Sequence, residues 1–435
     1  MAKRTAAPKS VLLLVNADCN DTELHAPPAE QGPRRRCDFY ELERVLDADV
    51  IDWSAVEASF LGRTVRRLSN WYLAAALLAF LRHRDYKLIW CLTEAEGAIL
   101  ALLLKLFRRD TPLMVICAVP TSRFMSLMIR RFRVQSNMTK LLPTQAAALG
   151  TLIKWGVPAS KLGLLPYQVD ADFFDPRWAH GVERGRPYVL AVGRQSRDFR
   201  TLVAAAEGLP VRVVIALGSL WAPEAGDEWA RNLPANVEIT TEGYVGLRDL
   251  YAGCAFVVVP LLETDIQNGV TSIQEAMAMG KAVIATRTRG QSDVLADARA
   301  LLRDGSARAT RGNFARHFAP TRPELHGQTG IYVPPGDVRA LRAAMEHLLA
   351  APARADELGR RGRAVSETIV SLDRYLQRIC ELSAPYLSGR GSLALPGPLR
   401  GEGRQQVATG RAPTRYPTST GLGRRGAGGG PSLPV

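Results

Sequence analysis

Short, continuous apolar runs alternate with segments of helical periodicity along most of this chain, and that alternation limits the folds open to it. In the first part, the runs predict strands at Val11–Asn16, Val50–Asp52, Lys87–Cys91, Leu113–Val119 and Leu141-Leu142, the last followed by a turn at Pro143. The helical patterns cover Asp38–Leu46, Ser69–Leu81, Glu94–Phe107 and a segment from Thr144, as N-cap, to Trp155. Because the strands are apolar throughout, both faces of their sheet must be covered, which indicates a parallel sheet between helices.

The same alternation starts again after a polar stretch at Asp175–Pro187. Further strands are predicted at Tyr188–Val192, Val211–Leu217, Val237–Thr240, Ala255–Pro260 and Ala282–Thr286, and a last pair of helices at Asp337–Ala350 and Leu372–Tyr386. We therefore expect an α/β fold of two doubly wound domains, residues 1–182 and 183–370, followed by a helix over 371–387. Ligands of such sheets bind beyond the carboxyl ends of the strands, so the loops after Val192, Leu217 and Pro260 are the candidate sites.

Two segments fit neither pattern. Arg303–His326 is rich in Arg, Gly and Pro and is predicted to be a surface insertion. Residues 388–435 hold 12 glycines, 6 prolines, 7 arginines and 1 glutamate, so this tail carries a large share of the formal charge of +14. It has only five leucines and two valines, scattered among glycines, prolines and arginines, and we predict a disordered tail that is dispensable for folding. The remaining, moderately basic body suits an anionic ligand.

Several classes of protein are excluded or disfavoured. No apolar run approaches the roughly 18 residues of a membrane-spanning helix, and the N-terminal run is too short for a signal peptide, so a cytoplasmic protein is expected. The six cysteines are scattered, without the spacing of a zinc site or a disulfide framework. The sequence lacks H-E-x-x-H, G-x-x-x-x-G-K-[ST] and G-x-S-x-G motifs. Nucleic-acid binding is not expected either, because no aromatic-interleaved basic patch is present.

Three weak motifs favour structural roles. A G-x-G-x-x-G match at Gly421–Gly426 lies in the tail, with no strand before it and no helix after it, so a dinucleotide site is not indicated. The Asp-x-Asp pairs Asp47/Asp49 and Asp170/Asp172 do not follow strong strands. They are more typical of turn and cap residues than of a metal-held diphosphate.

The loop after Val192 combines Gly193, Arg194 and Arg197 in front of a predicted helix. Glycine lets the chain approach a ligand closely, arginine can donate two bonds to one phosphate, and helix N–H groups favour an anion. The loop is thus a candidate phosphate site, with a merely solvated loop as the alternative.

The stretch Pro260–Thr286 predicts strand, polar loop, helix and strand, with Thr271 or Ser272 opening the helix. Glu275 would lie near the first turn, where its carboxylate could accept hydrogen bonds from both ribose hydroxyls of a nucleotide. The alternative is an ordinary exposed glutamate on a helix surface.

Four further stretches belong with these two: Gly330–Asp337, Leu142-Pro143-Thr144, Gly156-Val157-Pro158 and Tyr167–Pro176. Together they resemble the GT-B glycosyltransferases of family 4, the glycosyl transferases group 1. The resemblance covers residues 135–385 well and 10–134 weakly. It implies two Rossmann-like domains facing a central cleft, with the acceptor on the side of residues 1–182 and the nucleotide-sugar donor on the side of residues 183–370.

The resemblance also implies site residues. Gly193 and Arg194 would hold the donor diphosphate, with Arg197 near the second basic residue of the family. Glu275 matches the second glutamate of the E-x7-E motif, but the first falls on Gln267, so that catalytic position departs from the family. Glu263 or Asp265 could substitute. The loop amides of Asn268, Gly269, Val270 and Thr271 would complete the donor site.

The catalytic histidine of the family has no match at Pro120–Arg123, which leaves His25, in the first loop, as the candidate. The implied activity is a retaining, metal-independent transfer of the hexosyltransferase type, from a nucleotide sugar to a glycan, lipid-linked or small-molecule acceptor in glycan, polysaccharide or glycolipid biosynthesis. No cofactor is implied. The alternatives are an epimerase or phosphorylase of the same fold, and a non-catalytic nucleotide or partner binder, which Gln267 keeps open.

The segment Arg123–Arg133 is apolar nearly all round and carries four arginines without an acidic residue. This pattern is compatible with contact to an anionic membrane surface, which would make the protein peripheral on the inner face of a membrane. A core helix with basic ends is the alternative.

Overall fold

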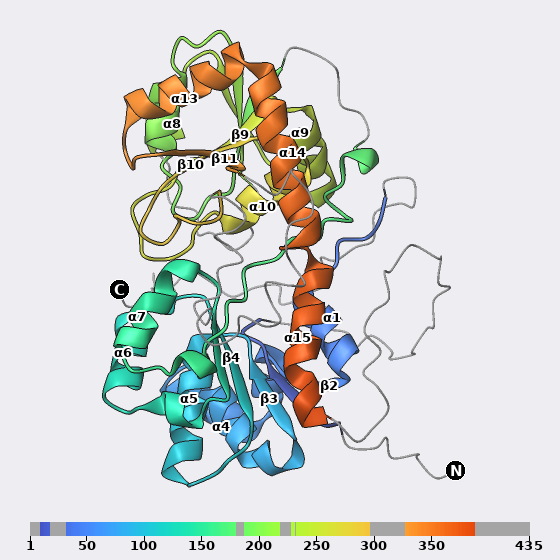
Figure 1. Cartoon of the computed structure of the whole chain (residues 1–435), viewed down its shortest axis with the longest axis vertical. Helices are drawn as coiled ribbons and strands as arrows, with labels where there is room; N and C mark the ends of the chain where they lie inside the picture. The colour runs from blue at the N-terminus through green and yellow to red at the C-terminus, as the bar shows by residue number, and fades with distance from the viewer. Residues whose placement is uncertain are drawn as a thin grey trace, which may run out of the picture. The chain divides into compact units, whose positions relative to one another are not determined.

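The computed structural model describes residues 9–17, 32–179, 187–217, 228–230, 232–295 and 327–387. His25, the boundary at residue 182, the loop after Leu217, the 303–326 insertion and the tail from residue 388 lie outside the described residues. The described part contains two parallel sheets, as the sequence predicts (Figure 1).

The first sheet has the order β2-β1-β3-β4-β5, with all neighbouring strands parallel. Its strands are β1 (Val11–Leu14), β2 (Ala48–Ile51), β3 (Leu88–Cys91), β4 (Leu113–Cys117) and β5 (Lys140–Pro143). One face packs against α4 (Trp71–Arg82) and α5 (Glu94–Leu106), and the other against α1 (Asp38–Leu46) and α15 (Leu372–Leu387). The final helix of the described chain therefore covers the first sheet, next to α1 (Figure 1).

The second sheet has the order β11-β10-β9-β6-β7-β8. Its strands are β6 (Tyr188–Val192), β7 (Arg212–Ala216), β8 (Val237–Thr240), β9 (Phe256–Val259), β10 (Val283–Thr286) and β11 (Gly330–Val333). One face is covered by α8 (Phe199–Ala206) and α13 (Val338–Ala350), the other by α9 (Tyr244–Gly253), α10 (Val270–Ala278) and α14 (Pro352–Thr368). The order of strands reverses between β6 and β9, and in the first sheet between β1 and β3, so the ligand crevices lie there.

Four further α-helices belong to the described part: α2 (Trp53–Ala58), α3 (Phe60–Leu68), α6 (Arg123–Arg130) and α7 (Leu149–Lys154). The prediction that Thr144 caps a helix is wrong. A short 3-10 turn, Ala146–Ala148, separates β5 from α7, and its first N–H is taken by the Asp293 carboxylate at 2.9 Å. No helix in the described ranges is both long and apolar enough to cross a membrane.

The sequence analysis missed β11 and α14. The composition of α14 explains why that helix shows no apolar periodicity. Its surface is mostly charged, and the face that it buries consists largely of small residues such as Ala355, Gly359 and Gly362. A Cβ on Gly359 would overlap the backbone carbonyl of Gly280, just after α10, and one on Gly362 would meet the Met277 side chain at 3.0 Å. Close backbone approach, rather than an apolar stripe, thus holds α14 on α10.

Gly359→Ala is expected to lower the free energy of unfolding by about 2 kcal/mol, because overpacking at a backbone contact forces the helices apart. Gly150→Ala, in α7, is the matched control, since a Cβ there would meet nothing within 4 Å. It should raise stability by about 0.5–1 kcal/mol through helix propensity. Urea unfolding of both variants tests this, and equal shifts would contradict the packing role of Gly359.

Candidate functional site

The reversal of strand order in the second sheet brings together two loops that the sequence analysis considered separately. The backbone N–H of Asp198 donates to the Pro260 carbonyl at 3.1 Å, and that of Leu262 donates to the Ser196 carbonyl at 3.1 Å. Arg197 and Leu261 form an antiparallel bridge between these two bonds. The loop after β6 and the loop after β9 therefore form one continuous wall at the crevice.

Arg197 points inward at this wall rather than toward an opening. Its guanidinium donates to the carbonyls of Val192 (3.0 Å) and Gln195 (2.9 Å) and to the Ser272 hydroxyl (3.1 Å). Burial lowers the pKa of Arg197 to about 10, although Tyr251 and Glu275 act to raise it. Gly193, with φ +97°, lies directly under the guanidinium, and a Cβ there would overlap it. Position 193 thus requires glycine, because the Arg197 guanidinium packs against its Cα at the end of β6.

The sequence analysis predicted that the N–H groups at the start of α8 favour an anionic ligand. In the structure a side chain of the protein caps this helix end. The Asp198 carboxylate accepts from the Thr201 N–H (3.1 Å) and the Thr201 hydroxyl (2.7 Å). A capping carboxylate occupies one of the helix donors and repels a second anion, which disfavours a phosphate at this helix end.

The N-terminus of α10 is better suited. Gly269, with φ +74°, precedes the helix and provides no side-chain cap. The first-turn N–H groups, from Val270 onward, have no partner within the helix and can donate to a phosphate. The Asn268 N–H is already used, since it donates to the Ile266 carbonyl at 2.8 Å. The helix begins earlier than predicted, which moves Glu275 to its second turn.

The Glu275 carboxylate lies at the inner end of a cavity of about 70 Å³. It accepts a hydrogen bond from the Tyr251 hydroxyl at 2.9 Å. Burial raises the pKa of Glu275 to about 6, while Arg35, Tyr251 and Arg197 act to lower it. The cavity is also lined by Thr271 and by the segment before α1, including Arg35.

The sequence analysis missed Arg35, although its position in a run of three arginines was a signal. Its guanidinium stacks over the Tyr244 ring, 4.3 Å from the centroid, and its charge acts on Glu275. Glu263 and Asp265 were considered as substitutes for a catalytic glutamate, but both bind Arg289. Glu263 accepts from the backbone N–H of Arg289 at 3.0 Å, and Asp265 accepts from its guanidinium at 2.6 Å.

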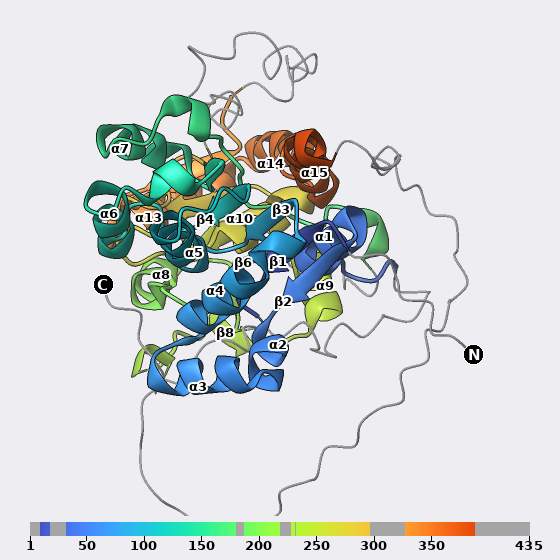
Figure 2. The ribbon, with the colours of Figure 1, turned by 90° about the horizontal axis from the view of Figure 1, so that it is seen from below.

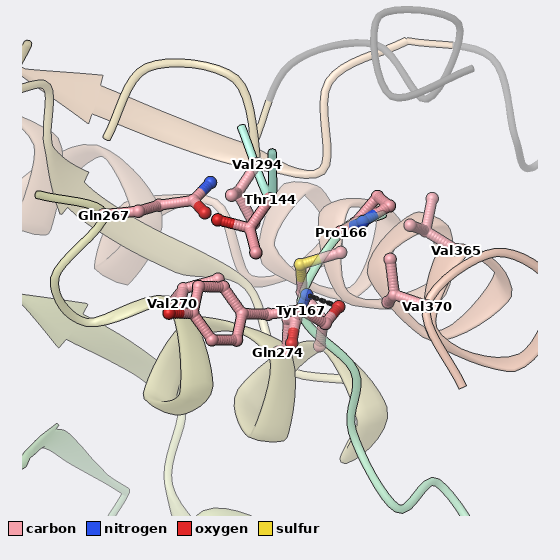
Figure 3. A pocket seen from close by; sticks show the side chains of 10 residues that line it. Thr144, Pro166, Tyr167, Gln267, Val270, Gln274, Val294, Val365 and Val370 are labelled. Carbon is pink, nitrogen blue, oxygen red and sulfur yellow. Dashed lines mark hydrogen bonds between the residues drawn. The ribbon is translucent and has the colours of Figure 1, made fainter. Parts of the chain in front are cut away.

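Gln267 is 5% exposed and faces the first half of the chain. Its amide nitrogen donates to Asp293 at 3.3 Å, but its Oε1 has no hydrogen-bond partner. The same holds for Oγ1 of Thr144 and Oε1 of Gln274, whose amide nitrogen donates to the Tyr167 carbonyl at 2.7 Å. All three side chains line one small cavity of about 10 Å³ (Figure 3). Three acceptor oxygens at one place suit hydroxyl donors.

The reversal of strand order in the first sheet holds two acids that the sequence analysis also missed, the buried Glu96 and the partly buried Glu94. Glu94 accepts from the Ala118 N–H at 3.0 Å, and Glu96 accepts from the Thr93 hydroxyl at 3.0 Å. Burial raises the pKa of Glu94, and it raises that of Glu96 to about 8. The signal was present, because two glutamates open an otherwise apolar helix directly after a buried strand.

Glu96 should make stability fall as the pH rises. Between pH 4.5 and about 8 the folded protein keeps a proton on Glu96 that the unfolded chain releases, so the free energy of unfolding decreases across this window. Melting curves from pH 5 to 8.5 should show a decline in Tm that Glu96→Gln reduces by several degrees. The exposed Glu207→Gln is the control, and a decline unchanged in Glu96→Gln would contradict the assignment.

Both Asp-x-Asp pairs lie in ion-pair networks. Arg36 binds Asp170 at 2.9 Å and Asp172 at 3.0 Å, and Asp49 accepts from the Tyr86 hydroxyl at 2.7 Å. The residues that the structure describes contain no group of three or more His, Cys, Asp or Glu side chains placed to hold a metal ion.

Comparisons with known proteins agree with the fold. Residues 186–351 match the family model of the glycosyl transferases group 1. A search of curated proteins gives no match. Among solved structures, sucrose-phosphate synthase from Thermosynechococcus elongatus is 19% identical, with a TM-score of 0.60 over 87% of this chain and 98% of that one.

Two further structures cover nearly the whole of their own chains. A glycosyltransferase from Rickettsia africae is 13% identical, with a TM-score of 0.61 over 88% of this chain and 100% of that one. HepE of Anabaena, in complex with UDP and glucose, is 13% identical, with a TM-score of 0.57 over 86% and 99%. This chain therefore has the GT-B fold, and its residues 186–351 match the model of the glycosyl transferases group 1 family.

Proposed function

We propose that this protein is a glycosyltransferase that moves a sugar from a nucleotide donor to an acceptor hydroxyl. The observation that carries the proposal is Glu275, a carboxylate buried at the reversal of strand order and open to a cavity beside the uncapped N-terminus of α10. A carboxylate there can accept hydrogen bonds from two ribose hydroxyls. The family match over the same region supports this use.

In this proposal the donor diphosphate is held by the first-turn amides of α10 together with Arg194, at the mouth of the loop after β6. Departure of the diphosphate places negative charge where these donors point, so the rate enhancement is mainly electrostatic. Arg197 supports them from behind, because its bonds to Val192 and Ser272 join the strand end to α10. Retention of configuration and independence of metal are part of the proposal.

The sugar is assigned to the cavity of Gln267, Gln274 and Thr144. Their three acceptor oxygens suit sugar hydroxyls. The cavity has room for no more than one water molecule, so the two halves of the chain would have to separate to admit a sugar. The acceptor is assigned to the reversal of strand order in the first sheet, beside Glu94 and Glu96. A nucleotide binder without transferase activity is the second candidate, because Gln267 carries no charge at the family's catalytic position.

Thermal stabilisation by UDP-, GDP- and ADP-sugars tests donor binding, with UDP-sugars first because HepE was solved with UDP. Arg194→Ala should weaken binding of the nucleoside diphosphate far more than binding of the nucleoside, because the arginine is assigned to phosphate. Equal losses for both ligands would remove that assignment. Release of the nucleoside diphosphate in the presence of an acceptor distinguishes an enzyme from a binder.

A further inference from the structure

A basic cavity lies at the opposite edge of the first sheet from the cleft. Helices α6 and α7 follow the carboxyl ends of β4 and β5 and run back toward the amino ends, so their C-termini meet at that edge. The two helices lie side by side in both views (Figures 1 and 2). A cavity of about 540 Å³ opens between their ends and is lined by Arg130, Arg133, Lys154 and Lys161.

The four cations of this basic cavity come from separate short elements and converge without an acid. No Asp or Glu lines the cavity, and none of the four forms an ion pair with any carboxylate in the described ranges. Lys161 is held in place, since its ammonium donates to the carbonyls of Gln135 (2.9 Å) and Ser136 (2.8 Å). Like charges gathered in a concave site repel one another, and an anionic ligand would offset that repulsion.

Large apolar side chains are exposed around the same edge. Phe132 and Ile153, each next to a cation of the cavity, are 40% and 43% exposed. Leu106 and Phe107, at the end of α5, are 67% and 59% exposed. They belong to the same surface, because the neighbouring Lys105 ammonium donates to the carbonyl of Phe132 at 2.7 Å. We call these four side chains the apolar rim.

The structure shows which side chains of the segment Arg123–Arg133 are buried. Helix α6 has one face in the core and one face on the surface. Met125, Met128 and Ile129 are buried, whereas Phe124 and Leu127 are exposed. One face therefore belongs to the core, and the other adds apolar surface beside the rim. Cations beside exposed apolar side chains are typical of a surface that contacts lipid, whereas a site for a free anion needs no such rim.

We propose that the basic cavity binds the phosphate headgroup of an anionic phospholipid, while the apolar rim enters the interface of the bilayer. This site goes beyond the proposed glycosyl transfer and does not depend on it. It lies at the amino edge of the first sheet, whereas Gln267 and Glu275 belong to loops and helices at the carboxyl edge of the second. Membrane binding and donor binding should therefore respond to different variants.

Co-sedimentation of the full chain with vesicles tests the proposal. Vesicles of phosphatidylcholine with and without phosphatidic acid compare wild type with two triple variants that each remove three positive charges. The cavity variant is Arg130→Gln/Arg133→Gln/Lys154→Gln, and the control is Arg212→Gln/Arg339→Gln/Arg360→Gln, at exposed positions around the second sheet. The arginines of the tail are the same in all three proteins.

We expect wild type and the control to bind phosphatidic-acid vesicles and the cavity variant to bind them tenfold to a hundredfold more weakly. A second variant, Phe132→Ser/Ile153→Ser, should lose binding mainly at high salt, where the electrostatic attraction is screened. Thermal stabilisation by nucleotide sugar should be unchanged in every variant that keeps the wild-type Tm. If nucleotide sugars do not stabilise wild type at all, that result contradicts the proposed glycosyl transfer and leaves the lipid site unaffected.

Three results would overturn the lipid site. Equal losses in the two triple variants would show that only net charge matters. Equal binding of wild type to vesicles without phosphatidic acid would remove the role of the phosphate. Binding of soluble glycerol phosphate in the cavity, without binding to vesicles, would make it a site for a free phosphate monoester.

Discussion

Replacing Glu275 by glutamine is expected to lower the affinity for the donor nucleotide sugar tenfold to a hundredfold. The substitution keeps the shape of the side chain but removes the charge that strengthens its bonds to two ribose hydroxyls. Each such charge-assisted bond contributes about 1.5–3 kcal/mol before screening, and about 1.4 kcal/mol corresponds to one decade of affinity. Calorimetric titration with the donor identified by thermal stabilisation measures this effect.

The pH dependence provides a second measurement of the same assignment. Because burial raises the pKa of Glu275 to about 6, the carboxylate becomes protonated as the pH falls below that value. Donor affinity of wild type should therefore decrease from pH 7.5 to pH 5, whereas the affinity of Glu275→Gln should change little over this range. The same decrease in both proteins would assign the pH dependence to another group.

Gln267→Glu tests the neighbouring loop, because it restores the residue of the family in the cavity assigned to the sugar. The amide that donates to Asp293 is lost, so the new carboxyl group must share a proton with Asp293. Binding of the nucleoside diphosphate should remain nearly intact, and turnover should be equal or higher. A binder without activity would show no transfer in wild type, yet could gain some in Gln267→Glu. If wild type binds no nucleotide sugar and Glu275→Gln changes nothing, the donor site is assigned wrongly.

Arg36→Ala is expected to lower the free energy of unfolding by about 3 kcal/mol. The Arg36 guanidinium binds Asp170 at 2.9 Å and Asp373, on α15, at 2.7 Å. The Asp170 side chain is only 4% exposed, so removing its partner leaves a buried charge uncompensated. The same arginine joins the segment before α1 to the last helix, and both lie on one face of the first sheet.

Arg44→Ala is the matched control for this ion pair. Arg44 binds Glu41 at 2.7 Å within α1, but its side chain is 57% exposed, so the loss should be below about 1 kcal/mol. Urea unfolding without ligand measures both, because Arg36 also lines the cavity at Glu275. A small effect for Arg36→Ala, similar to that of Arg44→Ala, would show that water compensates Asp170 in the variant.

The sequence by itself determined the two sheets and the position of the candidate site. Apolar runs of four or five residues between helical patterns indicate strands buried on both faces, and the helix Asp38–Leu46 and the strand Val237–Thr240 have the bounds that the sequence predicts. Parallel strands place their carboxyl ends at one edge, so the loops after Val192 and Pro260 could be identified without knowing how they meet.

Only the tertiary structure decided which groups face one another, because that depends on contacts between distant residues. Local pattern could not show that Arg197 turns toward Ser272, that Asp198 occupies the donors of α8, or that Arg35 lies opposite Glu275. Helix α14 could not be predicted from apolar periodicity, because small residues on its buried face let its backbone pack closely against α10. The segment of α6 is ambiguous in sequence for the same physical reason: which of its apolar side chains are buried depends on the elements that pack against it.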